Sequence, residues 1–119
     1  MKLILRSAIA FLFLIAFAFP SLAQSKIAIR TAPLSSSCVI VSVKNLQTAP
    51  LNASAAYLMV FDQNTCKKAC DTKIALNRNL NPCELFRFKL CCSHALPAKY
   101  IAYVKIFYAG GYSEDWLWN

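Results

Sequence analysis

The sequence has few of the side chains that most enzymes use for acid–base chemistry. It contains one histidine, His94, and five acidic residues among 119. Glu114 and Asp115 are adjacent, so in a strand they face opposite sides and do not form a catalytic carboxylate pair. The motifs G-x-S-x-G and H-E-x-x-H are absent, as is a glycine-rich phosphate loop. We therefore predict a protein without catalytic residues and without a cofactor.

The cysteines offer two other kinds of chemistry, and we expect neither. Cys66 and Cys70 have the closest approach to zinc-ligand spacing, but a second pair with such spacing is lacking. Cys91 or Cys92 beside His94 has the residue types of a thiol nucleophile and its base. An even number of cysteines in an exported protein instead favours structural disulfides. A small hydrolase or inhibitor is the third functional reading, after the two given below.

The N-terminus has the order of a secretory signal peptide. Lys2 and Arg6 precede an uncharged apolar run at residues 8–19, and Ser21 and Ala23 place small residues before a cleavage point. The alternative is a membrane anchor, but a spanning helix needs about 20 apolar residues and this run is shorter. We predict that residues 1–23 are removed and that residues 24–119 form one domain without a membrane span. The expected location is extracellular or periplasmic.

Cleavage leaves a small, basic, cysteine-rich domain. Loss of Lys2 and Arg6 lowers the net charge from +8 to about +6. All six cysteines lie in residues 24–119, which predicts three disulfides that compensate for a small core. Neighbouring cysteines in a strand face opposite sides, so Cys91 and Cys92 need different partners. We expect Cys38 and Cys66 to pair with them in either order, and Cys70 to pair with Cys83.

The clearest strand signal is the segment 84–92. Phe86, Phe88 and Leu90 alternate with Arg87 and Lys89, which predicts a half-buried strand. Similar patterns, separated by turn-forming segments, predict seven short strands at residues 26–30, 38–44, 55–61, 72–76, 84–92, 99–108 and 112–118. One helical turn is possible between Cys66 and Cys70, and residues 45–54 are expected to form a loop. The fold class is all-β, an antiparallel sandwich of about seven strands.

One short segment sharpens this expectation. In Leu96-Pro97-Ala98-Lys99-Tyr100, a tyrosine opens the sixth strand after a proline-containing corner. This resembles the tyrosine corner of immunoglobulin-like and fibronectin-III-like sandwiches, in which the hydroxyl bonds to backbone upstream. The usual tryptophan of the third strand is replaced by Tyr57. The resemblance implies a superfold, and a superfold does not determine function.

Basic and aromatic residues are expected to separate onto the two sheets. We place strands one, two, four and five in a basic sheet, in which Arg87 and Lys89 face solvent. The basic residues expected on this sheet or its turns are Lys26, Arg30, Lys44, Lys73, Arg78, Arg87 and Lys89. Strands three, six and seven form the other sheet, and its outer face is expected to present Tyr103, Phe107 and some of Tyr112, Trp116 and Trp118. Exposed aromatic clusters mark contact sites. The alternative is that the two tryptophans belong to the core, because alternation alone does not say which face is inward.

The first functional reading is a secreted, non-catalytic recognition protein that binds through the aromatic sheet, the basic sheet or both. The alternative is a secreted effector or antimicrobial-like protein whose basic face acts on anionic surfaces or a host target. The expected partners are a protein, a glycan or an anionic surface, and we do not expect nucleic acid among them. Asn52-Ala53-Ser54 is an N-glycosylation acceptor sequence in a predicted loop, which places the candidate acceptor at Asn52.

Overall fold

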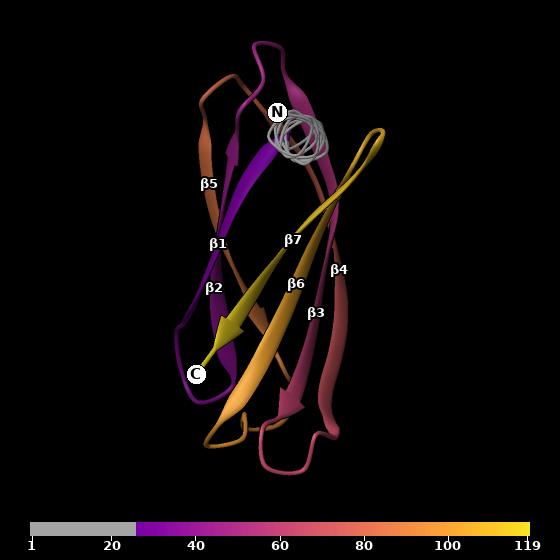
Figure 1. Cartoon of the computed structure of the whole chain (residues 1–119). Helices are drawn as coiled ribbons and strands as arrows, with labels where there is room; N and C mark the ends of the chain where they lie inside the picture. Colours follow the sequence, from indigo (N-terminus) through magenta and orange to yellow (C-terminus); the bar gives the residue numbers. More distant parts are fainter. Residues whose placement is uncertain (1–25) are drawn as a thin grey trace, which may run out of the picture.

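A computed structural model describes residues 26–119, so the predicted signal peptide at residues 1–23 lies outside the described residues. The described part of the chain forms seven β-strands (Figure 1). Their bounds are β1 (Ile27–Pro33), β2 (Cys38–Asn45), β3 (Leu51–Asp62), β4 (Lys68–Leu80), β5 (Leu85–Cys91), β6 (Tyr100–Tyr108) and β7 (Gly111–Trp118). The predicted number of strands is confirmed.

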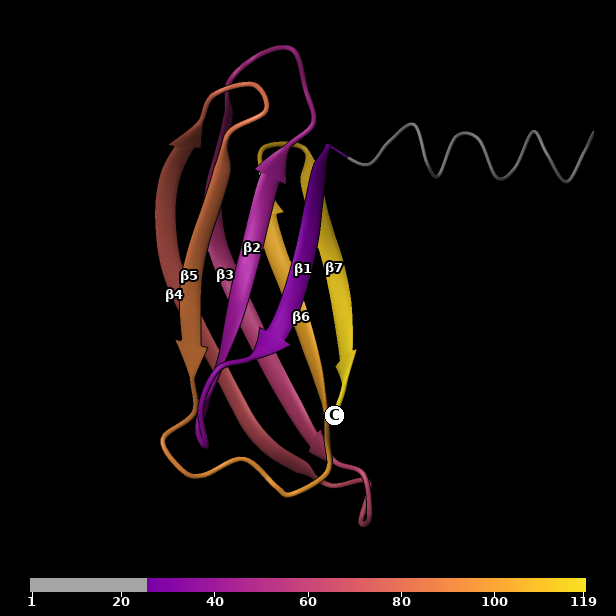
Figure 2. The same cartoon turned by 90° about the vertical axis from the view of Figure 1, so that its left-hand side faces the viewer.

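The strands make two antiparallel sheets packed face to face (Figure 2). One has the order β1-β2-β5 and the other the order β4-β3-β6-β7. The predicted antiparallel β-sandwich is therefore confirmed, but the predicted place of the fourth strand is wrong. β4 pairs with β3 through a hairpin that begins at Asp62, so it lies in the sheet of β6 and β7 and not beside β5.

The core lies between the sheets and follows from period-2 alternation. In β2, Val39, Val41 and Val43 are fully buried, and in β6 every second residue from Tyr100 to Tyr108 is buried. Because neighbouring residues of a strand face opposite sides, burying one set leaves the other on the outer face. This alternation determines which side chains form the outer surfaces of the sandwich.

Three local predictions require correction. β4 extends over Lys68–Leu80 instead of residues 72–76, and its first residues are extended where a helical turn was considered. β3 begins at Leu51, so Asn52 lies in a strand and not in a loop. These errors have one cause. β3 and β4 pair from Leu51↔Leu80 onward, and pairing with a long neighbouring strand overrides the low strand preference of asparagine and lysine.

Asn45 is the only buried polar residue in the described part of the chain. Its Nδ2 donates to the carbonyl oxygens of Ala49 and Leu80, each at 3.0 Å, and its Oδ1 accepts from the Gln47 N–H at 2.9 Å. Since Asn45 ends β2 and Leu80 ends β4, the bond to Leu80 joins the two sheets at one end of the sandwich, and the other two bonds hold the segment between β2 and β3.

Tyr100 is buried at the start of β6, on the inward face that a tyrosine corner requires. Its hydroxyl is buried and forms no hydrogen bond of standard geometry with the described residues. The upstream backbone bond that defines the corner is therefore not formed, and the immunoglobulin-like or fibronectin-like assignment stays a prediction.

Candidate functional site

The outer face of the four-stranded sheet carries a continuous group of aromatic rings. Register places Met59, Tyr103 and Trp116 in one row across β3, β6 and β7, and Ala55, Phe107 and Tyr112 in another. The outward parity of the same strands adds further rings. We call the whole group the aromatic face, formed by Tyr57, Phe61, Tyr103, Phe107, Tyr112, Trp116 and Trp118. Tyr112 and Trp116 are each 52% exposed and Trp118 is 70% exposed.

The rings of the aromatic face contact one another across the strands. The centroids of Tyr103 and Trp116 are 4.5 Å apart, and those of Phe107 and Tyr112 are 6.2 Å apart, both in tilted geometry. These separations fall in the range of favourable aromatic pairs. Contact between neighbours holds the rings in place before any partner arrives, so less side-chain entropy is lost on binding.

Two charged side chains lie in the middle of the aromatic face. Lys105 and Glu114 are directly opposite in register, and the Lys105 ammonium lies 4.2 Å from the Tyr112 ring centroid. The Tyr103 hydroxyl donates a hydrogen bond to Glu114. Burial raises the pKa of the Tyr103 hydroxyl, and the bond to Glu114 raises it further, so the hydroxyl stays a donor at neutral pH. The site is apolar at its edges and polar at its centre.

The aromatic residues expected at the binding sheet, Tyr112 included, all lie on this outer face, and none belongs to the core. The sequence reasoning missed Tyr57 and Phe61 as members, and it missed the cationic centre at Lys105. The sequence signal for Tyr57 was its position in the strand alternation. Its neighbours Ala56 and Leu58 are buried, so Tyr57 faces the opposite, outer side. Because residues 55–61 are apolar on both faces, the pattern alone did not mark which face was outward.

The outer face of the three-stranded sheet is basic. We call it the basic face, formed by Arg30, Lys44, Arg87 and Lys89. Arg30 and Arg87 flank Ser42 in one cross-strand row, and Lys89 is opposite Ile40. β1, β2 and β5 contain no acidic residue, and the four basic side chains form no ion pair with a described residue.

The basic face is smaller than predicted, because Lys73 and Arg78 lie on β4 in the opposite sheet. Lys73 lies over the Phe107 ring at 5.4 Å. Arg78 forms an ion pair with Glu84 at 3.3 Å and lies over the Phe86 ring at 4.5 Å. These two residues thus bridge or border the sheets instead of extending the basic face.

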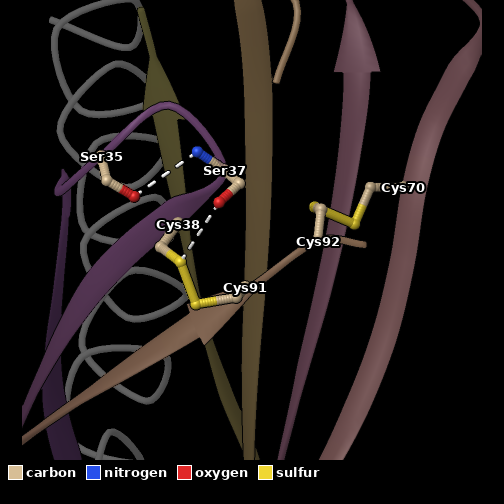
Figure 3. The surroundings of a disulfide bond; sticks show 6 residues. All are labelled: Ser35, Ser37, Cys38, Cys70, Cys91 and Cys92. Carbon is tan, nitrogen blue, oxygen red and sulfur yellow. Dashed lines mark hydrogen bonds between the residues drawn. A yellow bond between two sulfur atoms is a disulfide. The ribbon is translucent and has the colours of Figure 1, made fainter. Parts of the chain in front are cut away.

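Two disulfides hold the same end of the sandwich (Figure 3). Cys38 and Cys91 are opposite each other in β2 and β5, so their bond lies within the three-stranded sheet. The bond from Cys70 to Cys92 joins β4 to the residue that follows β5, and therefore connects the two sheets. The Ser37 hydroxyl donates to the Cys38 sulfur at 3.7 Å.

The disulfide pairing differs from the expected one. Cys38 pairs with Cys91, which is one of the two partners expected for it. Cys70, however, pairs with Cys92 and not with Cys83. Cys66 and Cys83 are free and exposed. The cause is the position of β4: it begins beside the end of β5 and ends near Cys83, so Cys70 and Cys83 lie at opposite ends of the strand.

The remaining candidate positions are exposed. Asn52 donates from Nδ2 to the Asn79 Oδ1 at 2.7 Å, across β3 and β4. His94 borders a groove of about 510 Å³ together with Cys91 and Cys92. Both cysteines are disulfide-bonded, so neither provides a thiolate beside the imidazole. Within residues 26–119, no three His, Cys, Asp or Glu side chains gather into a metal-binding group. The same residues include no helix of the length and apolarity needed to cross a bilayer.

The fold belongs to the class of antiparallel β-sandwiches, and solved structures with a similar fold exist. The chain is similar in structure to the archaellum periplasmic stator protein FlaG from Sulfolobus acidocaldarius, with a TM-score of 0.57 and 11% identity over 76% of this chain and 97% of that one. It is also similar to a chain of the periplasmic stator complex FlaF and FlaG from the same organism, with a TM-score of 0.60 and 12% identity over 79% and 90%. The sequence matches no protein-family model and no curated protein.

Proposed function

We propose that this chain is an exported, non-catalytic recognition protein that binds a partner protein through the aromatic face. The observation that supports this function best is the exposure of Tyr112, Trp116 and Trp118 on a sheet surface where further rings adjoin them. Tyrosine and tryptophan are enriched among residues that dominate binding energy. A folded protein seldom leaves such a group in water without a contact to make.

The composition of the aromatic face supports a protein partner over a glycan. Lys105 and Glu114 lie between the rings and supply one positive and one negative group at the centre. Protein interfaces combine aromatic anchors with a few charged groups that set orientation. One of the structurally similar proteins is described as part of a complex of two proteins, which agrees with a role in protein contact for this sandwich.

Export is supported by covalent chemistry. The chain forms two disulfides, and disulfides persist in oxidising compartments outside the cytoplasm. The predicted signal peptide at residues 1–23 requires the same route. The two structurally similar proteins are described as periplasmic. Together these observations favour an extracellular or periplasmic location.

The test compares two apolar residues of equal exposure on opposite sheets. Trp116 is 52% exposed on the aromatic face, and Leu85 is 51% exposed on β5. Purified, oxidised residues 24–119 are screened by surface plasmon resonance against exported proteins of the source organism and a glycan array. We expect a protein ligand whose affinity falls about thirtyfold in Trp116→Ala and less than about threefold in Leu85→Ala. Glycans alone as ligands, or equal losses in both variants, would contradict the proposal.

A second candidate function follows from the basic face. Four unpaired cations on β1, β2 and β5, without an acidic residue among these strands, favour an effector or antimicrobial-like protein that acts on anionic surfaces. In that case the protein binds phosphatidylglycerol vesicles and dissociates as salt is added. The double variant Arg87→Ala/Lys89→Ala weakens this binding, whereas Trp116→Ala leaves it unchanged. Vesicle binding that resists salt would exclude this mechanism.

A further inference from the structure

The two lateral sides of the sandwich, where the edge strands of the sheets meet, differ. On one side, β4 and β5 are joined by the Cys70–Cys92 disulfide and by Arg78, which contacts both Glu84 and the Phe86 ring. On the other side, β1 lies beside β7 (Figure 2). These two strands border a groove of about 990 Å³. Residues 27–32 of β1 form one wall of the groove and residues 112–115 of β7 form the other. The β4–β5 side of the sandwich is therefore closed by a disulfide, whereas on the β1–β7 side the two strands lie close together without a disulfide between them and border a groove.

β7 presents unpaired backbone groups along the β1–β7 side. Tyr100 and Asn119 exchange both of their backbone hydrogen bonds, which sets the phase of the antiparallel ladder between β6 and β7. Because bonded and non-bonded pairs alternate, Asp115 and Leu117 bond to β6 while Glu114, Trp116 and Trp118 direct their N–H and C=O groups away from it. No described backbone group pairs with these three residues. β7 is thus a free strand edge.

The side chain of Asp115 makes this edge selective. It occupies an inward position of β7 and lines the groove, and it has no ion-pair partner among the described residues. A partly buried carboxylate without a partner favours a nearby cation. Glu114 provides a second carboxylate on the outer side of the same edge. A strand added to this edge therefore meets the Asp115 carboxylate on its groove side, where Arg30 of β1 also lines the groove without forming an ion pair with Asp115. On its outer side it meets Glu114, which has Lys105 opposite it in β6.

Two of the antiparallel registers in which a second copy could pair with this edge bring like charges together. In the antiparallel register with the longest overlap, where residues 112–118 of two copies pair, each Asp115 lies directly opposite the other. A shift that brings Ser113 opposite Asp115 places the two Glu114 side chains opposite each other. Like charges in directly opposed positions destabilise strand pairing. A strand from another protein, with a basic residue at this position, avoids both conflicts.

We propose that β7 binds an extended segment of a partner protein by β-strand addition, and that this segment places a lysine or arginine opposite Asp115 in the groove. Residues on either side of the basic residue pair with the backbone of Glu114 and Trp116. The next residues in each direction face the groove and contact Leu117 and Ser113, so they are apolar or small. This site uses the backbone edge of β7, which borders the aromatic face, but the proposal does not depend on the function proposed for that face.

A short peptide tests the mode of binding. The probe is the capped heptapeptide Thr-Val-Thr-Lys-Thr-Val-Thr, titrated into oxidised residues 24–119 and followed by the amide signals of Glu114 and Trp116 in NMR spectra. The matched control replaces the central lysine with glutamate. We expect saturable shifts at these amides with the lysine peptide and at least about tenfold weaker binding of the glutamate peptide. No binding of the lysine peptide up to millimolar concentration would overturn the proposal.

N-methylation distinguishes backbone pairing from contact with side chains alone. Methylating the two threonines beside the lysine removes the N–H groups that bond to β7, and we expect at least about tenfold weaker binding. Methylating the lysine and the two valines alters the other edge of the peptide, and binding persists. Equal losses from both patterns would show that the peptide does not add as a strand.

Two variants of the full domain test the charge. Asp115→Asn weakens the lysine peptide at least about threefold and removes its preference over the glutamate peptide. Asp71→Asn on β4 removes the same charge from the opposite edge of this sheet and leaves the affinity unchanged. Thermal unfolding of both variants verifies that they are folded. An unchanged affinity in Asp115→Asn, or concentration-dependent dimerisation through β7, would contradict the proposal.

Discussion

Replacing Asn45 with alanine should produce a large loss of stability for a single polar residue. Asn45 is completely buried, and its side chain makes three hydrogen bonds to backbone atoms of Ala49, Leu80 and Gln47. Alanine makes none of these bonds, and it leaves the Leu80 carbonyl oxygen without its buried donor. The two sheets thereby lose their polar connection at the end opposite the disulfides.

The expected magnitude follows from the number of bonds. A typical intramolecular hydrogen bond contributes about 1 kcal/mol net, so three contribute roughly 3 kcal/mol. A small domain has a total stability of about 5–15 kcal/mol. For a domain of this size, 1 kcal/mol corresponds to about 4–8 °C in the melting temperature, so Asn45→Ala should lower it by about 12–24 °C.

The measurement is urea unfolding of the oxidised domain, followed by tryptophan fluorescence, with calorimetry for the melting temperature. Asn52→Ala is the matched control, because Asn52 makes one exposed hydrogen bond to Asn79. We expect the control to change the free energy of unfolding by less than about 0.5 kcal/mol. If Asn45→Ala costs less than about 1 kcal/mol, or no more than Asn52→Ala, the proposed role of this residue in joining the sheets is wrong.

Three further predictions concern covalent links and charge. The double variant Cys70→Ser/Cys92→Ser should lose about 3 kcal/mol, since the bond spans a sequence separation of 22 residues; urea unfolding measures this, and a loss under about 1 kcal/mol would contradict it. The native oxidised protein should bind two equivalents of iodoacetamide, at Cys66 and Cys83, by intact mass; a chain that takes up none has three bridges. A backbone bond from Asn81 and the Arg78 guanidinium lower the pKa of Glu84 below 4.5, so the stability that the ionised group provides is present above that pH and is lost as the pH falls through the lowered value. The gap in stability between wild type and Glu84→Gln should therefore be largest at neutral pH and should shrink as the pH falls through the lowered pKa of Glu84, and a gap that is constant with pH would refute the assignment.

Alternation along single strands made much of the fold predictable. Residues 84–92 and 99–108 have alternating patterns, and the structure contains β5 and β6 there with the expected faces. The aromatic face followed from the same parity, because Tyr103 and Phe107 alternate with small or β-branched residues that fill the core. Local pattern was sufficient wherever one strand has one polar and one apolar side.

The partner of β4 was not predictable in this way. Its inward positions include Thr72 and Ile74, whereas its outward positions include Lys73, so its pattern fits either sheet equally well. β4 pairs with β3 because the two strands form a hairpin. Such a contact between two segments produces no periodic pattern within the sequence of either one. The errors in disulfide pairing and in the extent of the basic face both follow from this one ambiguity.

The positions of the disulfides determine how the chain responds to tension. A force applied at its two ends is transmitted through the Cys38–Cys91 bond, which bypasses the intervening span of 53 positions. Only the segments before Cys38 and after Cys91 extend when the oxidised protein is pulled, whatever happens to the packing between them. Mechanically, residues 38–91 act as an inextensible block between two extensible segments. Reduction of the Cys38–Cys91 bond alone would release only residues 39–70, because the Cys70–Cys92 bond would still bypass residues 71–91.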